Sequence, residues 1–140
     1  MRAALLLVFA LTACAVRPAV AVELQTIASG GYARDDSGRQ AVLVKTEDEY
    51  RRLWAEKIGS EPAPEADFGK GVVVLLLAGS RSTGGYAVVP ESVDVSGGSA
   101  VIHAPVQRPG RGAIVTQALT SPYAVVFINS RDLESVQWPE

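Results

Sequence analysis

The chain has 140 residues, of which 48% are hydrophobic and 20% are charged, so it is long enough for one globular domain and too apolar to be disordered. The formal net charge is −2, and the basic residues are scattered, with no run longer than Arg51-Arg52. Binding to nucleic acid needs a clustered positive face, so the sequence predicts no nucleic-acid partner. With only 6% aromatic residues, the core is expected to consist of aliphatic side chains, which suit β-sheets.

The start of the chain has the form of an export signal. Arg2 supplies a positive start, and the apolar run over residues 3–13 is too short to cross a bilayer core of about 30 Å. The sequence Leu-Thr-Ala-Cys at 11–14 matches a bacterial lipobox, which predicts a signal peptide over residues 1–13, lipid attachment at Cys14 and an anchor or linker over 14–23. Cleavage here or at the alternative Ala-Val-Ala site at 19–21 predicts an exported protein of the bacterial cell envelope. Lipid attachment at Cys14 would also bind the protein to the membrane.

The second cleavage site is Ala-Val-Ala at 19–21, after which the signal peptide would be residues 1–21. Cys14 is the only cysteine, so the chain cannot form an internal disulfide. A free thiol is a liability in an oxidising compartment, and either acylation or removal with the leader would eliminate it.

Two strands and one helix are expected next. Residues 24–32 and 40–44 are strand-like, and the polar turn residues 34–38 between them predict a hairpin. Thr46 and Glu49 form a capping box that begins a helix, and Gly59 is expected to end it in the left-handed conformation. The apolar residues at helical spacing, expected to face the core, are Tyr50, Leu53, Trp54 and Ile58.

The remaining chain predicts short strands joined by glycine- and proline-rich loops. Residues 60–69 form a connector rich in proline and acidic residues, from which Phe68 is expected to reach the core. Residues 72–78 are apolar without alternation, which favours a central strand covered on both faces. Residues 105–112 are an irregular basic loop, and the polar tail from Arg131 is expected to be loosely held. Further strands are expected at 86–89, 93–95, 100–102, 113–119 and 123–128, with a hairpin turn at 96–99.

These elements predict an α+β fold over residues 24–140. It is a mostly antiparallel β-sheet or sandwich of about seven or eight short strands, with one helix packed on one face.

No motif in the sequence indicates catalysis or cofactor binding. Residues 79–84 have the glycine spacing of a P-loop, but Gly85 and Tyr86 stand where its Lys and Ser or Thr are required. His103 is the only histidine, no Gly-x-Ser-x-Gly elbow exists for it to serve, and a lone histidine on a strand is usually structural or solvent-facing. Metal-ligand spacing is absent. The sequence therefore predicts a protein that is not an enzyme and has no metal and no cofactor.

Several segments together resemble the C-terminal domain family of PrcB, a protease-complex subunit. The resemblance rests on an apolar strand followed by Thr-Gly-Gly-Tyr at 83–86, then Val-Thr-Gln-Ala at 115–118 and Thr-Ser-Pro-Tyr at 120–123, and a last apolar strand. Its signature spans residues 72–128 of the expected domain. The resemblance implies a secreted or lipid-anchored bacterial domain whose founding member associates with a protease and stabilises it.

A second resemblance is to the chagasin-type inhibitors of papain-like cysteine proteases, which present a loop ending in Thr-Gly-Tyr. Thr83 to Tyr86 are similar to that loop. The sequence departs from that family at two positions. Val88 stands where the inhibitors have a Trp, and Gly110 follows Arg-Pro where the inhibitors have an aromatic residue. Inhibition of a protease, or binding of a small ligand in the envelope, is therefore the alternative function.

The functional hypothesis is a protein-binding surface built from loops on an inert β-scaffold, with a secreted protease as partner. Gly84 and Gly85 allow another backbone to come close, and Arg81 and Tyr86 are residue types favoured at binding hot spots. The alternative is that this loop is a structural turn with a buried tyrosine. The candidate binding residues are Arg81, Ser82, Thr83, Gly84, Gly85, Tyr86, Arg108, Arg111, Gln117, Ser121, Pro122 and Tyr123.

Overall fold

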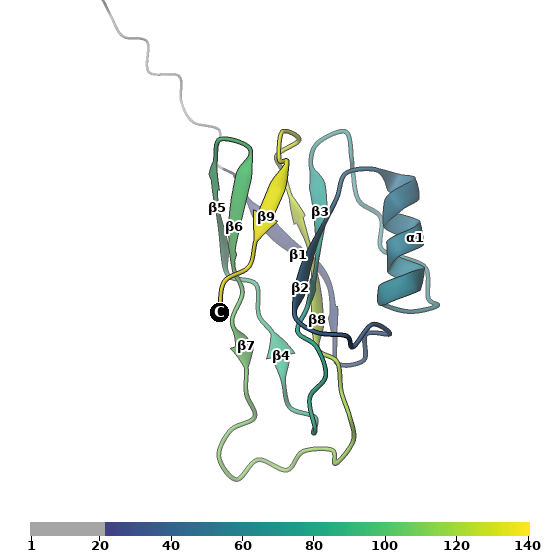
Figure 1. The fold of residues 1–140 in the computed structure, drawn as a ribbon, viewed down its shortest axis with the longest axis vertical. Coiled ribbons are helices and arrows are strands. Elements are labelled where there is room, and N and C mark those ends of the chain that lie inside the picture. The colour runs from purple at the N-terminus through teal and green to yellow at the C-terminus, as the bar shows by residue number, and fades with distance from the viewer. Residues whose placement is uncertain (1–21) are drawn as a thin grey trace, which may run out of the picture.

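A computed structural model describes residues 22–140, which form one helix and nine strands (Figure 1). The predictions that concern the signal peptide, its cleavage and Cys14 lie outside the described residues. The strands are β1 (Leu24–Gly30), β2 (Gln40–Val44), β3 (Val72–Leu77), β4 (Ala87–Val88), β5 (Ser92–Ser96), β6 (Ser99–His103), β7 (Val106–Gln107), β8 (Tyr123–Ile128) and β9 (Ser135–Gln137), and the helix α1 spans Glu47–Lys57.

Three layers make up the domain. The central layer is a four-stranded antiparallel sheet in the order β1-β8-β3-β2. Figure 1 shows α1 on one side of this sheet and the small sheet β5-β6-β9 on the other. The strands β4 and β7 pair with each other below the small sheet in that view. The α+β fold predicted from the sequence, with one helix on a mostly antiparallel sheet, is confirmed.

The strand β3 holds the layers together. All six of its residues are buried, and it pairs with β2 on one side and β8 on the other. Because side chains alternate along a strand, Val72, Val74 and Leu76 pack against the small sheet, whereas Val73, Leu75 and Leu77 pack against α1. The prediction of a central strand covered on both faces is confirmed.

The helix α1 begins and packs as its sequence indicates. The Oγ1 atom of Thr46 accepts a hydrogen bond from the backbone N–H of Glu49 at 3.3 Å, which caps the first turn. The four apolar residues predicted to face the core are all buried against the central sheet, and Phe68 packs on the same cluster: Tyr50, Leu53, Trp54 and Ile58.

The end of α1 differs from the prediction. Gly59 does not adopt a positive φ, and the last helical turn is capped by a distant segment instead. The backbone N–H groups of Arg34 and Asp35 donate to the carbonyls of Ile58 and Lys57 at 3.1 and 2.9 Å. Since these partners already satisfy the free carbonyls, a left-handed glycine is not needed to close the helix.

The hairpin predicted between residues 24–32 and 40–44 is wrong. β8 pairs with β1 and separates it from β3, and β2 lies at the opposite edge of the sheet. The polar residues 34–38 therefore do not form a turn between adjacent strands. Arg34 and Asp35 instead cap the end of α1. By contrast, the hairpin predicted at 96–99 is confirmed, because Gly97 and Gly98 both have positive φ, 56° and 82°, as the tight turn between β5 and β6 requires.

Two further predictions for the second half are wrong. Residues 113–119 form no strand, since this segment lies out in solvent without a neighbouring strand to pair with. The tail is also not loosely held: β9 pairs in parallel with β6, Leu133 is completely buried, and the indole N–H of Trp138 donates to the carbonyl of Ala104 at 2.8 Å. Leu133 and Trp138 belong to the core cluster on the small-sheet side of β3, which the overall polarity of the tail does not reveal.

Candidate functional site

The loop that carries Thr-Gly-Gly-Tyr lies against the loop after β7. Arg81 and Thr120 exchange two backbone hydrogen bonds of 2.7 and 2.9 Å, and the N–H of Gly84 donates to the carbonyl of Thr116 at 2.8 Å. The Oγ1 atom of the buried Thr120 also donates to the carbonyl of Thr83 at 2.7 Å. The two loops therefore support each other at one end of the domain.

Gly85 is required by this packing. Its φ is 86°, and a Cβ atom there would lie 2.7 Å from the Cβ of Pro109 and 2.8 Å from a methyl group of Val115. A side chain would thus be both strained and in collision. The backbone that comes close to the diglycine is the chain's own, so Gly84 and Gly85 hold the two loops in place.

We call residues 79–90 and 104–122 the loop end. It lies at the bottom of Figure 1. Its sequence contains three arginines and no acidic residue. The large hydrophobic residues that are exposed within residues 22–140 also gather there: Ile114 is fully exposed, Leu119 is 74% exposed, and Tyr32, 67% exposed, forms a bridge to Ser121. An exposed apolar surface combined with positive charge is typical of a docking site.

A shallow cavity of about 600 Å³ opens between the loop end and the tail. The guanidinium carbon of Arg81 lies 5.6 Å from the ring centre of Tyr86 on its wall. Arg39 stacks on the ring of Trp138 at 3.6 Å and donates from Nη2 to the carbonyls of Trp138 and Pro139. Burial lowers the pKa of Arg39, Glu140 opposes that shift, and the positive charge of Arg81 adds to it. The other residues that line the cavity are Pro105, Val106, Arg108, Pro139 and Glu140.

The candidate residues divide into surface and interior positions. Ser82, Arg108, Arg111 and Gln117 are exposed on the loop end, and Arg81, Thr83 and Tyr86 are half-buried there. Ser121 and Pro122 are buried, so they support the loop and do not face solvent. Tyr123 packs on the α1 side of the sheet, where burial and the nearby charge of Glu61 raise its pKa.

Sequence reasoning missed Arg39, Ile114, Leu119 and Trp138. The prediction of a strand at 113–119 implied that Ile114 and Leu119 would be covered, whereas both are exposed. A tryptophan in an otherwise polar tail was the available signal that the tail is packed.

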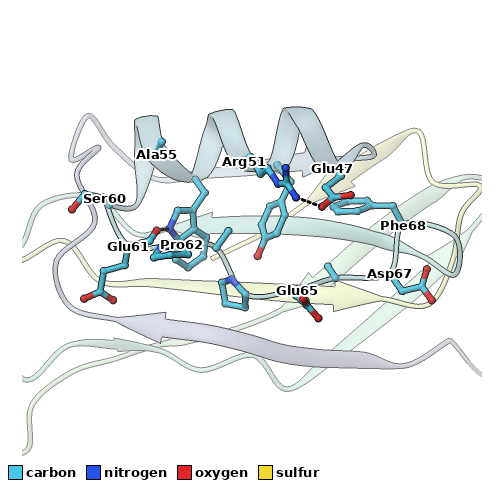
Figure 2. Close-up of a pocket in the computed structure, with 15 residues that line it drawn as sticks. Glu47, Arg51, Ala55, Ser60, Glu61, Pro62, Glu65, Asp67 and Phe68 are labelled. Atoms are coloured by element: carbon cyan, nitrogen blue, oxygen red, sulfur yellow. Dashed lines mark hydrogen bonds and ion pairs between the residues drawn. The ribbon is translucent and has the colours of Figure 1, made fainter.

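A second hollow lies between α1 and the connector that follows it. We call it the helix groove; its volume is about 960 Å³. Figure 2 shows the connector running along α1, with Glu61 and Glu65 on it and the ion pair between Arg51 and Glu47 above. The lining residues are Glu47, Tyr50, Arg51, Trp54, Ala55, Gly59, Ser60, Glu61, Pro62, Ala63, Pro64, Glu65, Ala66, Asp67 and Phe68.

The groups considered for catalysis are not arranged for it. His103 Nε2 lies 2.8 Å from a carboxylate oxygen of Asp94 on the neighbouring strand β5, and both side chains are exposed. The glycine-rich loop leads into the short strand β4, whereas a P-loop would open a helix. Within residues 22–140, no three His, Cys, Asp or Glu side chains are grouped to hold a metal ion.

Over the same residues, no helix is both long enough and apolar enough to cross a membrane.

Residues 72–129 match the model of a family described as PrcB C-terminal. No curated protein and no solved structure matches the chain. The matched segment runs from β3 to the residue after β8 and contains the whole loop end, whereas the helix groove lies before it. The match confirms the first of the two resemblances drawn from the sequence.

Proposed function

We propose, from the membership of residues 72–129 in the PrcB C-terminal family, that this chain is a non-catalytic domain that binds a protease through its loop end. The name of the family supports association with a protease complex. The family name does not say which surface of the domain contacts the protease, and the exposed side chains and charge of the loop end indicate that surface.

The observation that carries the proposal is the position of the exposed apolar side chains. Ile114 and Leu119 belong to the two mutually supported loops, and Tyr32, which follows β1, is joined to them by its bridge to Ser121. Exposing such side chains to water is unfavourable, and burying them against a partner recovers that free energy at about 25 cal/mol for each Å² of apolar surface. Because the loops are held by internal hydrogen bonds, little ordering is needed on binding.

The charge of the loop end indicates the kind of surface it meets. Arg81, Arg108 and Arg111 are not neutralised by any acidic residue of the same loops, although the whole chain has a net charge of −2. Arginine is favoured at interfaces because its planar group binds carboxylates with two hydrogen bonds. We therefore propose that the partner presents an acidic surface, which would also speed association at low salt.

The test is co-purification of the protein, expressed in its native host, with a protease from the cell envelope. We expect the variant carrying Ile114→Ser and Arg111→Glu to lose the protease while its melting temperature stays within about 2 °C of the parent, since both side chains are exposed. A matched control carries Arg51→Glu and Arg52→Glu on α1, and it should retain the partner. Retention by the loop-end variant, or equal loss in both, would contradict the proposed surface.

Export and lipid attachment at Cys14 complete the proposal, with the bacterial cell envelope as the location. The apolar run at 3–13 and the lipobox at 11–14 support it. Radioactive palmitate should label the parent and not Cys14→Ser. An exported mature chain that begins at Val22 and carries no label would instead assign the cleavage to the Ala-Val-Ala site.

Protease inhibition is the second candidate, and one observation favours it. The Thr-Gly-Gly-Tyr loop lies directly against Pro109, so the two loops compared with the chagasin-type inhibitors are adjacent here. Titration of papain-like proteases with the purified domain separates the two functions. Stoichiometric inhibition lost on Tyr86→Ala would support the inhibitor, whereas a stable complex with an active protease would support the proposal above.

A further inference from the structure

Three arginines line the cavity between the loop end and the tail, which we call the arginine cavity. Arg81 and Arg108 come from the two loops of the loop end, and Arg39 directly precedes β2. The volume of about 600 Å³ lies within the range of binding sites, about 300–1,000 Å³. The arginine cavity is therefore large enough to receive more than one side chain of a peptide.

The positive charge of the arginine cavity is not neutralised by the chain itself. Arg39, Arg81 and Arg108 form no ion pair within residues 22–140. Of the described residues that line the cavity, only Glu140 is acidic, and it forms no ion pair either. Burial lowers the pKa of Arg39, Glu140 opposes that shift, and the charge of Arg81 adds to it, so these charges act on one another. A bound anion would relieve the repulsion between the arginines.

Two of the arginines are held in place before any ligand binds. The guanidinium of Arg39 stacks on the ring of Trp138 at 3.6 Å, and its Nη2 donates to two backbone carbonyls of the tail. The backbone of Arg81 exchanges two hydrogen bonds with Thr120, and its guanidinium carbon lies 5.6 Å from the ring centre of Tyr86. Little conformational entropy is therefore lost when a ligand pairs with them.

The remaining hydrogen-bond donors and the apolar wall indicate the class of ligand. Arg81 donates from its side chain to one backbone carbonyl, at 3.3 Å, and Arg108 is exposed, so N–H groups of both remain for a ligand. A planar guanidinium binds a carboxylate with two parallel hydrogen bonds. Tyr86, Pro105 and Val106 line the same cavity and provide apolar surface. Together they fit a carboxylate that lies next to an apolar group.

We infer that the arginine cavity binds an acidic side chain of the partner, carried on a peptide segment with an apolar residue beside it. The carboxylate pairs with Arg81 and Arg108, the charge of Arg39 attracts it from the wall, and the apolar residue lies on Tyr86. Because Glu140 lines the same cavity, its carboxylate competes with that of the partner. This inference rests on the proposed docking to a protease and adds the cavity and the class of peptide that it takes.

The experiment titrates the purified protein with the peptide acetyl-Phe-Glu-Glu-Phe-amide and follows proton–nitrogen NMR spectra. The backbone amides of Tyr86 and Val106 report on the cavity, and the indole of Trp54, on the α1 side of the central sheet, is the distant reference. The same peptide with Gln-Gln in place of Glu-Glu is the neutral control of matched shape, and the peptide with Lys-Lys is the cationic control. Inorganic phosphate tests for a site that takes a free anion.

We expect the acidic peptide to shift the Tyr86 and Val106 signals saturably and to leave the Trp54 indole signal in place. The Gln-Gln peptide should bind about tenfold more weakly and the Lys-Lys peptide should not bind, because only a carboxylate pairs with the arginines. Equal binding of the Gln-Gln peptide, or no saturable shift at the cavity, would overturn the inference. Saturable binding of phosphate without binding of the acidic peptide would also overturn it, and would assign the cavity to a free anion.

Arginine variants separate pairing in the cavity from general attraction by positive charge. The pair Arg81→Gln and Arg108→Gln should weaken the acidic peptide about tenfold, whereas Arg52→Gln, an exposed arginine of α1 outside the cavity, should leave the affinity unchanged. The melting temperature of the double variant should stay within about 2 °C of the parent, because the hydrogen bonds between Arg81 and Thr120 are made by the backbone. Parent affinity in the double variant would contradict the pairing.

The competition by Glu140 has its own test. Glu140→Gln should strengthen binding of the acidic peptide about threefold, because it removes the acid that shares the cavity. Glu134→Gln, which changes an exposed acid of the tail outside the cavity, is the matched control and should leave the affinity as in the parent. The same affinity in Glu140→Gln as in the parent would contradict the competition.

The peptide titration and the capture of a protease fail separately. The capture test changes Ile114 and Arg111, which lie outside the arginine cavity. Binding of the acidic peptide with no captured protease would contradict the proposed partner and support the cavity as a site for acidic peptides. Capture that is lost in the Ile114 and Arg111 variant but kept in the Arg81 and Arg108 variant would support the docking surface and overturn the role of the cavity.

Discussion

The helix groove and the loop end are both attached to the central sheet, but they differ in charge and in the exposure of their large apolar residues. The groove is acidic, its aromatic residues are buried, and it lies on the α1 side of the central sheet. The loop end is basic, its large apolar residues are exposed, and it is built from loops on the strands of the other half. The comparison teaches that a chain with a net charge of −2 can carry two surfaces of opposite sign.

The two regions share β3, whose alternating side chains face one or the other. Leu75 packs toward α1 and Leu76 toward the small sheet, and both are completely buried. We expect Leu75→Ala and Leu76→Ala each to lower the free energy of unfolding by about 2–5 kcal/mol. In urea, circular dichroism and tryptophan fluorescence should give coincident transitions for both variants, because the sheet is common to both sides. Transitions that separate would show that the two sides fold independently.

The α1 side also contains a partly buried ion pair, between Lys57 and Asp35 at 2.7 Å, with both side chains less than a fifth exposed. The ammonium group of Lys57, with further hydrogen bonds from Ser37 and Gln40, holds the pKa of Asp35 well below its usual range. Asp35→Asn should lower the free energy of unfolding by about 1.5–3 kcal/mol at pH 7.

The pH dependence of this effect has a definite sign. A carboxylate with a depressed pKa stabilises the fold fully above its unfolded pKa of about 4, and the stabilisation is lost as the pH falls below that value. Urea titrations of the parent and the Asp35→Asn variant should therefore begin to converge below about pH 4, and the difference should vanish only when the pH falls below the depressed pKa of the folded state. The exposed pair of Asp94 and His103 is the matched control, and His103→Gln should change the free energy of unfolding at pH 7 by less than about 0.5 kcal/mol.

The two tryptophans allow a direct comparison of the two regions. Each donates its indole N–H to a backbone carbonyl, Trp54 to Glu61 and Trp138 to Ala104. We expect Trp54→Phe and Trp138→Phe each to lower the free energy of unfolding by about 1–2 kcal/mol, since each leaves a backbone carbonyl unpaired, in a part-buried bond at Glu61 and a buried one at Ala104. Hydrogen exchange should speed up in the connector for the first variant and in β9 for the second. Faster exchange in both places for either variant would mean that the regions are coupled.

The smallest effect is expected at the start of α1. Thr46→Ala removes the cap of the first turn and should lower the free energy of unfolding by about 1 kcal/mol, whereas Thr46→Ser retains an oxygen and should lose less. Chemical denaturation measures both. Binding at the loop end should not change in either variant, because the cap lies on the α1 side of the central sheet.

Local signals predicted local structure well. The capping box, the apolar stripe of α1, the buried run of β3 and the Gly97-Gly98 turn all form as expected, because each depends on residues close to one another in sequence. Three of the predicted docking residues, Arg81, Tyr86 and Arg108, line one cavity, and their role in docking stays a prediction. The assignment of 113–119 to a strand failed because an apolar, β-prone segment forms a strand only where another strand is available to pair with it.

The sequence by itself determined where the helix and most strands lie, which side chains are apolar enough to form the core, and that residues 72–129 carry the family signature. Only the tertiary structure decided the strand order β1-β8-β3-β2, the packing of the tail through Trp138, and the gathering of scattered charges into two surfaces of opposite sign. The physical reason is that capping and side-chain alternation depend on near neighbours along the chain, whereas pairing order and surface charge depend on residues that meet only when the sheet closes.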